Sequence, residues 1–269
     1  MRNLTPLTAS AADVFETCVR GISNSKRRTR IEKLRGKVVG QDALLVTASA
    51  AHSLQSLVSP PYSAATKRDL TWFYEQRLVR SSQGRMIYDQ ILALGRSGCP
   101  LCHSGTAQTL DHSFPKSRHP FLAISPLNLV PSCRDCNTSR GVGSGRVSIN
   151  PYSDGWLEKS RWLYASIPSL ASPEDLLFEP RRHPSWSDQQ WRLVQEFFTE
   201  SQIGRRYTDL AISEFTVVQS GIRRVKPAGL VDMRRYLDDR LSDLTQVGLN
   251  TWNVAATEAW RAAYWLIRW

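Results

Sequence analysis

The sequence predicts a mostly α-helical protein that encloses a small α+β insert. Apolar residues recur at helical intervals on both sides of residues 95–150. Between these limits the helical periodicity is lost, while proline, serine and ionisable residues become frequent. Four of the five cysteines also lie in this central segment. We therefore expect an N-terminal helical region over 1–94, the insert over 95–150 and a C-terminal helical region over 151–269.

The composition is that of a folded protein with a polyanionic partner. Hydrophobic residues make up 41% of the 269 residues, far more than in disordered chains. Lysine and arginine total 35 against 24 acidic residues, which gives a net charge of +11 and favours nucleic acid as a partner. The sequence shows neither an apolar run of about 20 residues nor a secretory signal, so we expect a cytoplasmic protein without membrane association.

In the N-terminal region the apolar pattern predicts three helices before the pair Cys99 and Cys102. Small and apolar residues recur at helical spacing over 41–58, where Ser59-Pro60-Pro61 ends the pattern. Two further helical patterns cover 67–78 and 86–94, and the second of these stops at the glycines that precede Cys99.

The C-terminal region predicts further amphipathic helices. Three apolar stripes share helical spacing, and we interpret them as core packing. Their members are Trp191, Val194 and Phe198; Met233, Leu237, Leu241 and Leu244; and Trp260, Tyr264 and Ile267.

Four cysteines predict a structural zinc site. Cys99 and Cys102 form one Cys-x2-Cys pair, and Cys133 and Cys136 form a second pair 30 residues later. Each pair aims two thiolates at one point, and together they complete the tetrahedron that zinc prefers. Such a set leaves no open coordination position, so the ion would hold the segment together without activating water. His103 could replace one thiolate, although the complete cysteine set makes that unnecessary.

A polar motif lies inside this cysteine frame. Asp111 and His112 stand at the end of an expected strand, Asn128 follows His112 by sixteen residues, and Asn137 follows Asn128 by nine. In this combination the segment resembles the HNH, or ββα-metal, endonucleases. The resemblance implies a β-hairpin that contains Asp111 and His112, followed by a helix that starts between Cys133 and Asn137.

The resemblance also implies a role for each residue of the motif. His112 would be the general base, and Asp111 and Asn137 would be the ligands of a catalytic Mg²⁺ or Mn²⁺ ion. Asn128 would brace the loop that carries His112. The chemistry agrees with these roles, because a neutral imidazole accepts a proton near pH 7 and Mg²⁺ prefers oxygen ligands.

Basic side chains near the motif are candidates for phosphate contact. Each could equally be an ordinary exposed charge, and the same two interpretations stay open for the run over 26–30. Cys18 is expected to be a small buried hydrophobe. The candidates for nucleic-acid contact are Lys116, Arg118, Arg134 and Arg140.

The whole chain is similar in outline to the HNH component of Septu-type and retron-associated anti-phage systems. The shared segments are 85–89, 110–141, 150–152 and 250–252. This resemblance implies a DNA endonuclease that works with an ATPase partner of the ABC or AAA-like class. Two alternatives remain open, which are a zinc-dependent nucleic-acid-binding module without catalysis and an HNH nuclease that cuts RNA.

Overall fold

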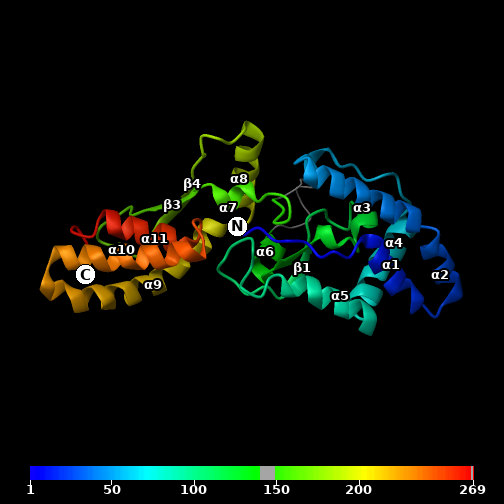
Figure 1. The fold of residues 1–269 in the computed structure, drawn as a ribbon, viewed down its shortest axis with the longest axis horizontal. Coiled ribbons are helices and arrows are strands. Elements are labelled where there is room, and N and C mark those ends of the chain that lie inside the picture. Colours follow the sequence, from blue (N-terminus) through cyan, green and yellow to red (C-terminus); the bar gives the residue numbers. More distant parts are fainter. Residues whose placement is uncertain (140–148, 268) are drawn as a thin grey trace. The chain divides into compact units, whose positions relative to one another are not determined.

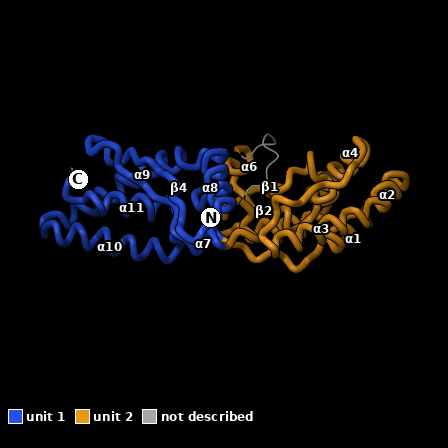
Figure 2. Tube along the Cα trace, turned by 90° about the horizontal axis from the view of Figure 1, so that it is seen from above, with its two compact units in different colours: residues 1–2, 102–104, 156–269 blue, residues 3–101, 105–155 orange. Residues whose placement is uncertain are grey.

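The computed structural model describes residues 1–139, 149–267 and 269, and it is mostly helical, as predicted (Figure 1). The described residues form two compact units (Figure 2). The first, here called the site unit, comprises 3–101 and 105–155, and the second, the C-terminal unit, comprises 1–2, 102–104 and 156–269. No helix in the described part of the chain combines the length and the apolar character needed to cross a bilayer.

The N-terminal helices of the site unit begin at side-chain caps. Four side chains cap these helices, and each accepts a hydrogen bond from the backbone N–H three residues later, in the first turn of the helix. The capping residues are Ser10, Asn24, Ser63 and Ser81. The helices are α1 (Ala11–Arg20), α2 (Ser25–Glu32), α3 (Arg35–Ala50), the 3₁₀ turn η1 (Leu54–Ser56), α4 (Ala64–Trp72), the π-helix η2 (Phe73–Val79) and α5 (Ser82–Ala93).

The predicted helix boundaries need three corrections. The helix expected over 41–58 begins six residues earlier and ends at Ala50, and the one expected over 67–78 begins at Ala64 and continues to Val79. The helix expected over 86–94 begins at Ser82 because Ser81 caps it. Helices α1 and α2 precede all three and lie in the region 1–94 that was expected to be helical, although their bounds were not predicted.

The insert forms the predicted hairpin and helix. Strands β1 (Thr109–His112) and β2 (Leu129–Ser132) pair antiparallel, and α6 (Arg134–Ser139) follows directly. The 3₁₀ turns η3 (Pro120–Leu122) and η4 (Pro126–Asn128) lie in the connection between the strands. The hairpin therefore contains Asp111 and His112, as expected.

The C-terminal unit is helical around one small sheet that was not predicted. Strands β3 and β4 pair antiparallel, and each has only four residues, too few for a recognisable alternating pattern. Two large rings, Trp162 and Trp260, are fully buried in this unit. Its elements are α7 (Trp156–Lys159), β3 (Leu163–Ser166), β4 (Leu177–Pro180), α8 (Asp188–Glu200), α9 (Ile203–Val225), η5 (Lys226–Ala228), α10 (Leu230–Val247) and α11 (Trp252–Ala262).

The predicted apolar stripes are buried in part. In α8 the buried side chains are Val194 and Phe197, whereas Phe198 is only partly buried. In α10 burial is complete at Met233 and Leu237 and fades toward the end of the helix. In the last stripe Trp260 and Ile267 are buried.

Two segments from the wider resemblance have structural roles. The Tyr152 hydroxyl donates to the Leu129 carbonyl at 2.8 Å and so ties residues 150–152 to β2. The buried Asn250 amide oxygen accepts from the backbone N–H groups of Trp162 and Leu163 at 2.8 and 3.2 Å. These bonds satisfy buried backbone groups, which explains why an asparagine suits the position.

The close packing of α5 against η2 generates a testable prediction. A Cβ added at Gly84 would lie 1.9 Å from the Arg77 carbonyl oxygen and 2.7 Å from Leu78 Cα, and neither backbone atom can move independently. We expect Gly84→Ala to lower the free energy of unfolding by roughly 1–3 kcal/mol, measured by urea denaturation. The control Gly40→Ala adds a Cβ with nothing within 4 Å and should stabilise by up to about 1 kcal/mol. Equal effects in the two variants would contradict the packing argument.

Candidate functional site

The first pair of cysteines lies in a tight turn after α5. The Cys99 N–H donates to the Gly105 carbonyl at 2.7 Å, which closes the turn. Two residues have positive φ angles, 112° at Gly98 and 57° at His103, so the turn depends on left-handed backbone at both. Gly105 has no room for a side chain, because its Cβ would lie 2.7 Å from Cys133 Cβ.

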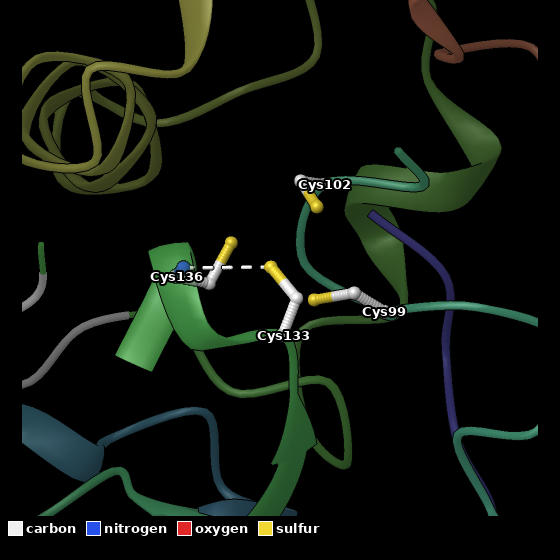
Figure 3. Close-up of side chains that lie close together, drawn as sticks. All are labelled: Cys99, Cys102, Cys133 and Cys136. Atoms are coloured by element: carbon white, nitrogen blue, oxygen red, sulfur yellow. Dashed lines mark hydrogen bonds between the residues drawn. The ribbon is translucent and has the colours of Figure 1, made fainter. Parts of the chain in front are cut away.

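The second pair joins β2 to α6. Cys133 follows the last residue of β2, and Cys136 lies one turn into α6, where its N–H donates to Cys133 Sγ at 3.5 Å. This contact is typical of a Cys-x2-Cys turn whose thiolates point to one side (Figure 3).

The four sulfur atoms converge. The Sγ atoms of Cys99, Cys102, Cys133 and Cys136 lie within 4.8 Å of one another, and all four residues are buried and free of disulfides (Figure 3). Sulfurs around a tetrahedral zinc ion at about 2.3 Å stand about 3.8 Å apart, so a small contraction would complete the shell. The cluster can therefore hold a structural metal such as zinc, and within the described residues it needs no histidine ligand.

The hairpin separates the side chains of the polar motif between two faces. Thr109 pairs with Ser132 and Asp111 with Val130, and because side chains alternate along a strand, Thr109 and Asp111 share one face. The Asn137 Nδ2 donates to Thr109 Oγ1 at 2.9 Å, which fixes α6 on that face. The sequence motif thus brings Asp111 and Asn137 to the same side of β1.

His112 lies at the end of β1, and two contacts of its ring hold the side chain in place. Its Nε2 is 2.9 Å from the Ala123 carbonyl oxygen, and since a carbonyl only accepts, Nε2 carries the proton. The lone pair is consequently on Nδ1. The His112 ring also packs edge-on against Tyr74, with 4.6 Å between centroids. Burial lowers the pKa of His112 to about 4, although the bond to Ala123 opposes the shift, so the ring is neutral at pH 7.

Lys116 brings a positive charge to the same place. Its Nζ donates to Glu75 Oε1 at 2.9 Å and lies 4.7 Å from the centroid of the Tyr74 ring. The ammonium group also contributes to the lowered pKa of His112. Tyr74 and Glu75 both belong to the π-helix η2, a distortion that is frequent at functional sites.

Asn128 closes the loop that follows His112. Its buried Oδ1 accepts from the Phe114 N–H at 2.7 Å, while its Nδ2 donates to the carbonyls of Phe114 and Leu122 at 3.1 and 2.9 Å. The Asn128 carbonyl also accepts from the Ser113 N–H at 3.0 Å. These bonds brace the loop and leave the amide no access to a substrate, because the residue is 0% exposed.

The other predicted contact residues are surface groups. Arg118 is exposed in the loop between the strands, and Arg134 is exposed at the first position of α6. Arg140 lies outside the described residues. Nothing in the structure assigns Arg118 or Arg134 to the His112 side chain.

Sequence reasoning missed Glu75, the partner of Lys116, and two residues that contact His112. Tyr74 and Glu75 lie almost forty residues before it, within an ordinary helical pattern, and Ala123 contributes only its carbonyl. The pairing of Lys116 with Glu75 carried no local signal either.

Comparisons with known proteins give one partial match. No family model matches the chain, and no solved structure matches it. The chain is similar to protein ea31 of Escherichia phage lambda, with 30% identity over 150 residues. This match covers 53% of the chain and 50% of ea31, so the chain spans about half the length of that curated relative.

The cysteine cluster predicts a metal content. We expect one zinc ion per chain by elemental analysis, and we expect its removal with a chelator to lower the melting temperature, because metal binding contributes to folding. Cys136→Ala should abolish the zinc. Cys18→Ala is the matched control, since Cys18 is equally buried at 0% exposure but lies in an apolar core cluster. A protein that retains zinc in Cys136→Ala, or loses it in Cys18→Ala, would contradict the assignment.

Proposed function

We propose that this protein is a metal-dependent HNH-type endonuclease that hydrolyses DNA, with His112 as the general base. The observation that carries the proposal is the state of His112. Its Nε2 is committed to the Ala123 carbonyl, and its neutral ring therefore offers Nδ1 as a proton acceptor at the end of β1.

The reaction follows from this acceptor. Nδ1 takes a proton from a water molecule, the water oxygen attacks phosphorus, and the bond to the 3′-oxygen breaks. The products are a 5′-phosphate and a 3′-hydroxyl, whose oxygen takes a proton from solvent. The ammonium group of Lys116, held beside Tyr74 and Glu75, adds positive charge near the phosphate.

The oxygen donors near Thr109 fit a catalytic Mg²⁺ or Mn²⁺ ion. The Asn137 Nδ2 is engaged by Thr109, so the amide presents its oxygen elsewhere, and Asp111 supplies a carboxylate on the same face of β1. Carboxylate and amide oxygens are the ligands that these hard cations take. When bound, the cation would supply Lewis-acid stabilisation of the negative charge that develops at phosphorus.

The zinc ion has a different role in this proposal. Four thiolates would saturate it, so it would be structural and would fix the turn before α6. The resemblance to Septu-type and retron-associated nucleases extends the proposal to anti-phage defence with an ATPase partner of the ABC or AAA-like class. The cytoplasm is the compartment in which such a partner and reduced thiolates would be found.

A second candidate is a zinc-dependent nucleic-acid-binding module without catalysis. The net charge of +11 and the cysteine cluster favour it, but both would be satisfied without an oriented His112. A third candidate is a nuclease that acts on RNA, because the motif residues act on a phosphodiester, which DNA and RNA share, and none of them recognises the 2′-hydroxyl.

Cleavage of supercoiled plasmid in Mg²⁺ tests the proposal. We expect the protein, alone or with an ATPase encoded beside it, to nick and linearise the plasmid, and we expect His112→Ala to reduce the rate at least about 100-fold. His183→Ala is the control, since His183 is bonded to Ser185 in the C-terminal unit.

Three outcomes would decide against the proposal. Binding without cleavage would favour the non-catalytic module, and faster cleavage of RNA would favour the third candidate. Equal cleavage rates in His112→Ala and the parent protein would show that His112 is not the general base.

A further inference from the structure

A cluster of arginines surrounds one buried carboxylate at the junction of α2 and α4. The Arg30 Nε and Nη2 donate to the two oxygens of Asp69 at 2.8 and 3.0 Å. Arg27 Nε is 3.9 Å from Asp69 Oδ1, and its guanidinium carbon lies 4.3 Å from the centroid of the Trp72 ring. The guanidinium of Arg30 is thus held by the Asp69 carboxylate, and that of Arg27 by the same carboxylate and the Trp72 ring.

The cluster carries more positive charge than Asp69 can neutralise. The bidentate bond from Arg30 lowers the pKa of Asp69, and the charges of Arg27 and Arg68 lower it further, which shows that three guanidinium groups act on one carboxylate. These four residues together have a net charge of +2. The bidentate bond from Arg30 is sufficient to pair with Asp69, so the charges of Arg27 and Arg68 are in excess of what neutralises the carboxylate.

The arginines keep donors that face solvent. The side chains of Arg30 and Arg27 are 53% and 37% exposed, and Arg68 is an exposed residue of α4. A guanidinium has five N–H donors, so Arg30 still has donors after its two bonds to Asp69. Oriented, exposed guanidinium groups of this kind match the oxygens of a phosphate.

The same helix connects the cluster to His112. Helix α4 continues without a break into η2, so one helical segment carries Arg68 and Trp72 at the cluster and Glu75 near His112. Glu75 holds Lys116, which acts on His112. The seven residues from Arg68 to Glu75 rise about 10 Å along the helix, which is short compared with a 30-base-pair duplex.

We propose that Arg27, Arg30 and Arg68 form a clamp for the backbone of the DNA that is cut at His112. This inference rests on the proposed function, because it extends the substrate path of the same site. The clamp contacts phosphates only and carries no sequence preference. Lys116 adds a further positive charge beside Tyr74, the residue of η2 that contacts His112.

The salt dependence of DNA binding tests the clamp. Each phosphate contact contributes about 0.9 to the slope of log K against log salt concentration. In a His112→Ala background without Mg²⁺, we expect the double substitution Arg27→Gln with Arg68→Gln to weaken binding of a 30-base-pair duplex at least about tenfold at 100 mM KCl and to reduce the slope by about 2. Arg30 is retained, so Asp69 keeps its bidentate partner and the fold is preserved, which circular dichroism would verify.

A matched variant separates the clamp from general charge. Arg223→Gln with Arg224→Gln removes the same two charges from exposed positions at the end of α9 and should change the affinity less than twofold. Equal weakening by the two double variants would overturn the clamp, and so would no weakening by the first. Failure of the parent protein to bind the duplex, or tighter binding of RNA than of DNA, would also overturn it.

The two proposals can fail separately. If the parent protein cuts plasmid but the clamp variant binds as the parent does, the clamp is wrong and the nuclease stands. If the clamp variant loses binding but no preparation cuts nucleic acid, the nuclease is wrong and a DNA-binding surface stands.

Discussion

The candidate site depends on the register of one short antiparallel ladder. Thr109 to His112 pair with Ser132 to Leu129, and this pairing decides which side chains of β1 meet α6 and which meet η2. A slip by one residue would exchange the two faces and separate Asn137 from Thr109. The buried Asn128 holds the loop at one end of the ladder, and the convergent cysteines hold the turn at the other. The position of His112 follows from these restraints and from the core cluster that contains Tyr74, Leu110 and Leu129.

Features set by nearby residues could be predicted from the sequence. The spacing of the two Cys-x2-Cys pairs predicts a shared metal site, and the structure confirms that all four sulfurs converge. The hairpin around Asp111 and the helix after Cys133 are confirmed as well. The catalytic roles of His112, Asp111, Asn128 and Asn137 remain proposals, because the structure shows their placement and not a reaction.

Features set by distant contacts could not be predicted. Tyr74 reaches the His112 ring only because η2 packs on the insert, and Asp69 organises Arg30 across 39 residues of sequence. The sequence showed a basic run over 26–30 but not the carboxylate or the ring that orient it. The β3–β4 hairpin was missed for a different reason, since four-residue strands leave no periodic signal.

The tautomer of His112 at neutral pH is the most direct test of the central claim. Nitrogen-15 NMR of the labelled protein, with the five histidines assigned by substitution, distinguishes a proton on Nε2 from one on Nδ1. The account predicts a neutral His112 ring with its proton on Nε2, bonded to the Ala123 carbonyl. A proton on Nδ1 would place the lone pair on Nε2, where it faces the Ala123 carbonyl and not water, and a charged ring at pH 7 would have no lone pair. Either result would contradict the account.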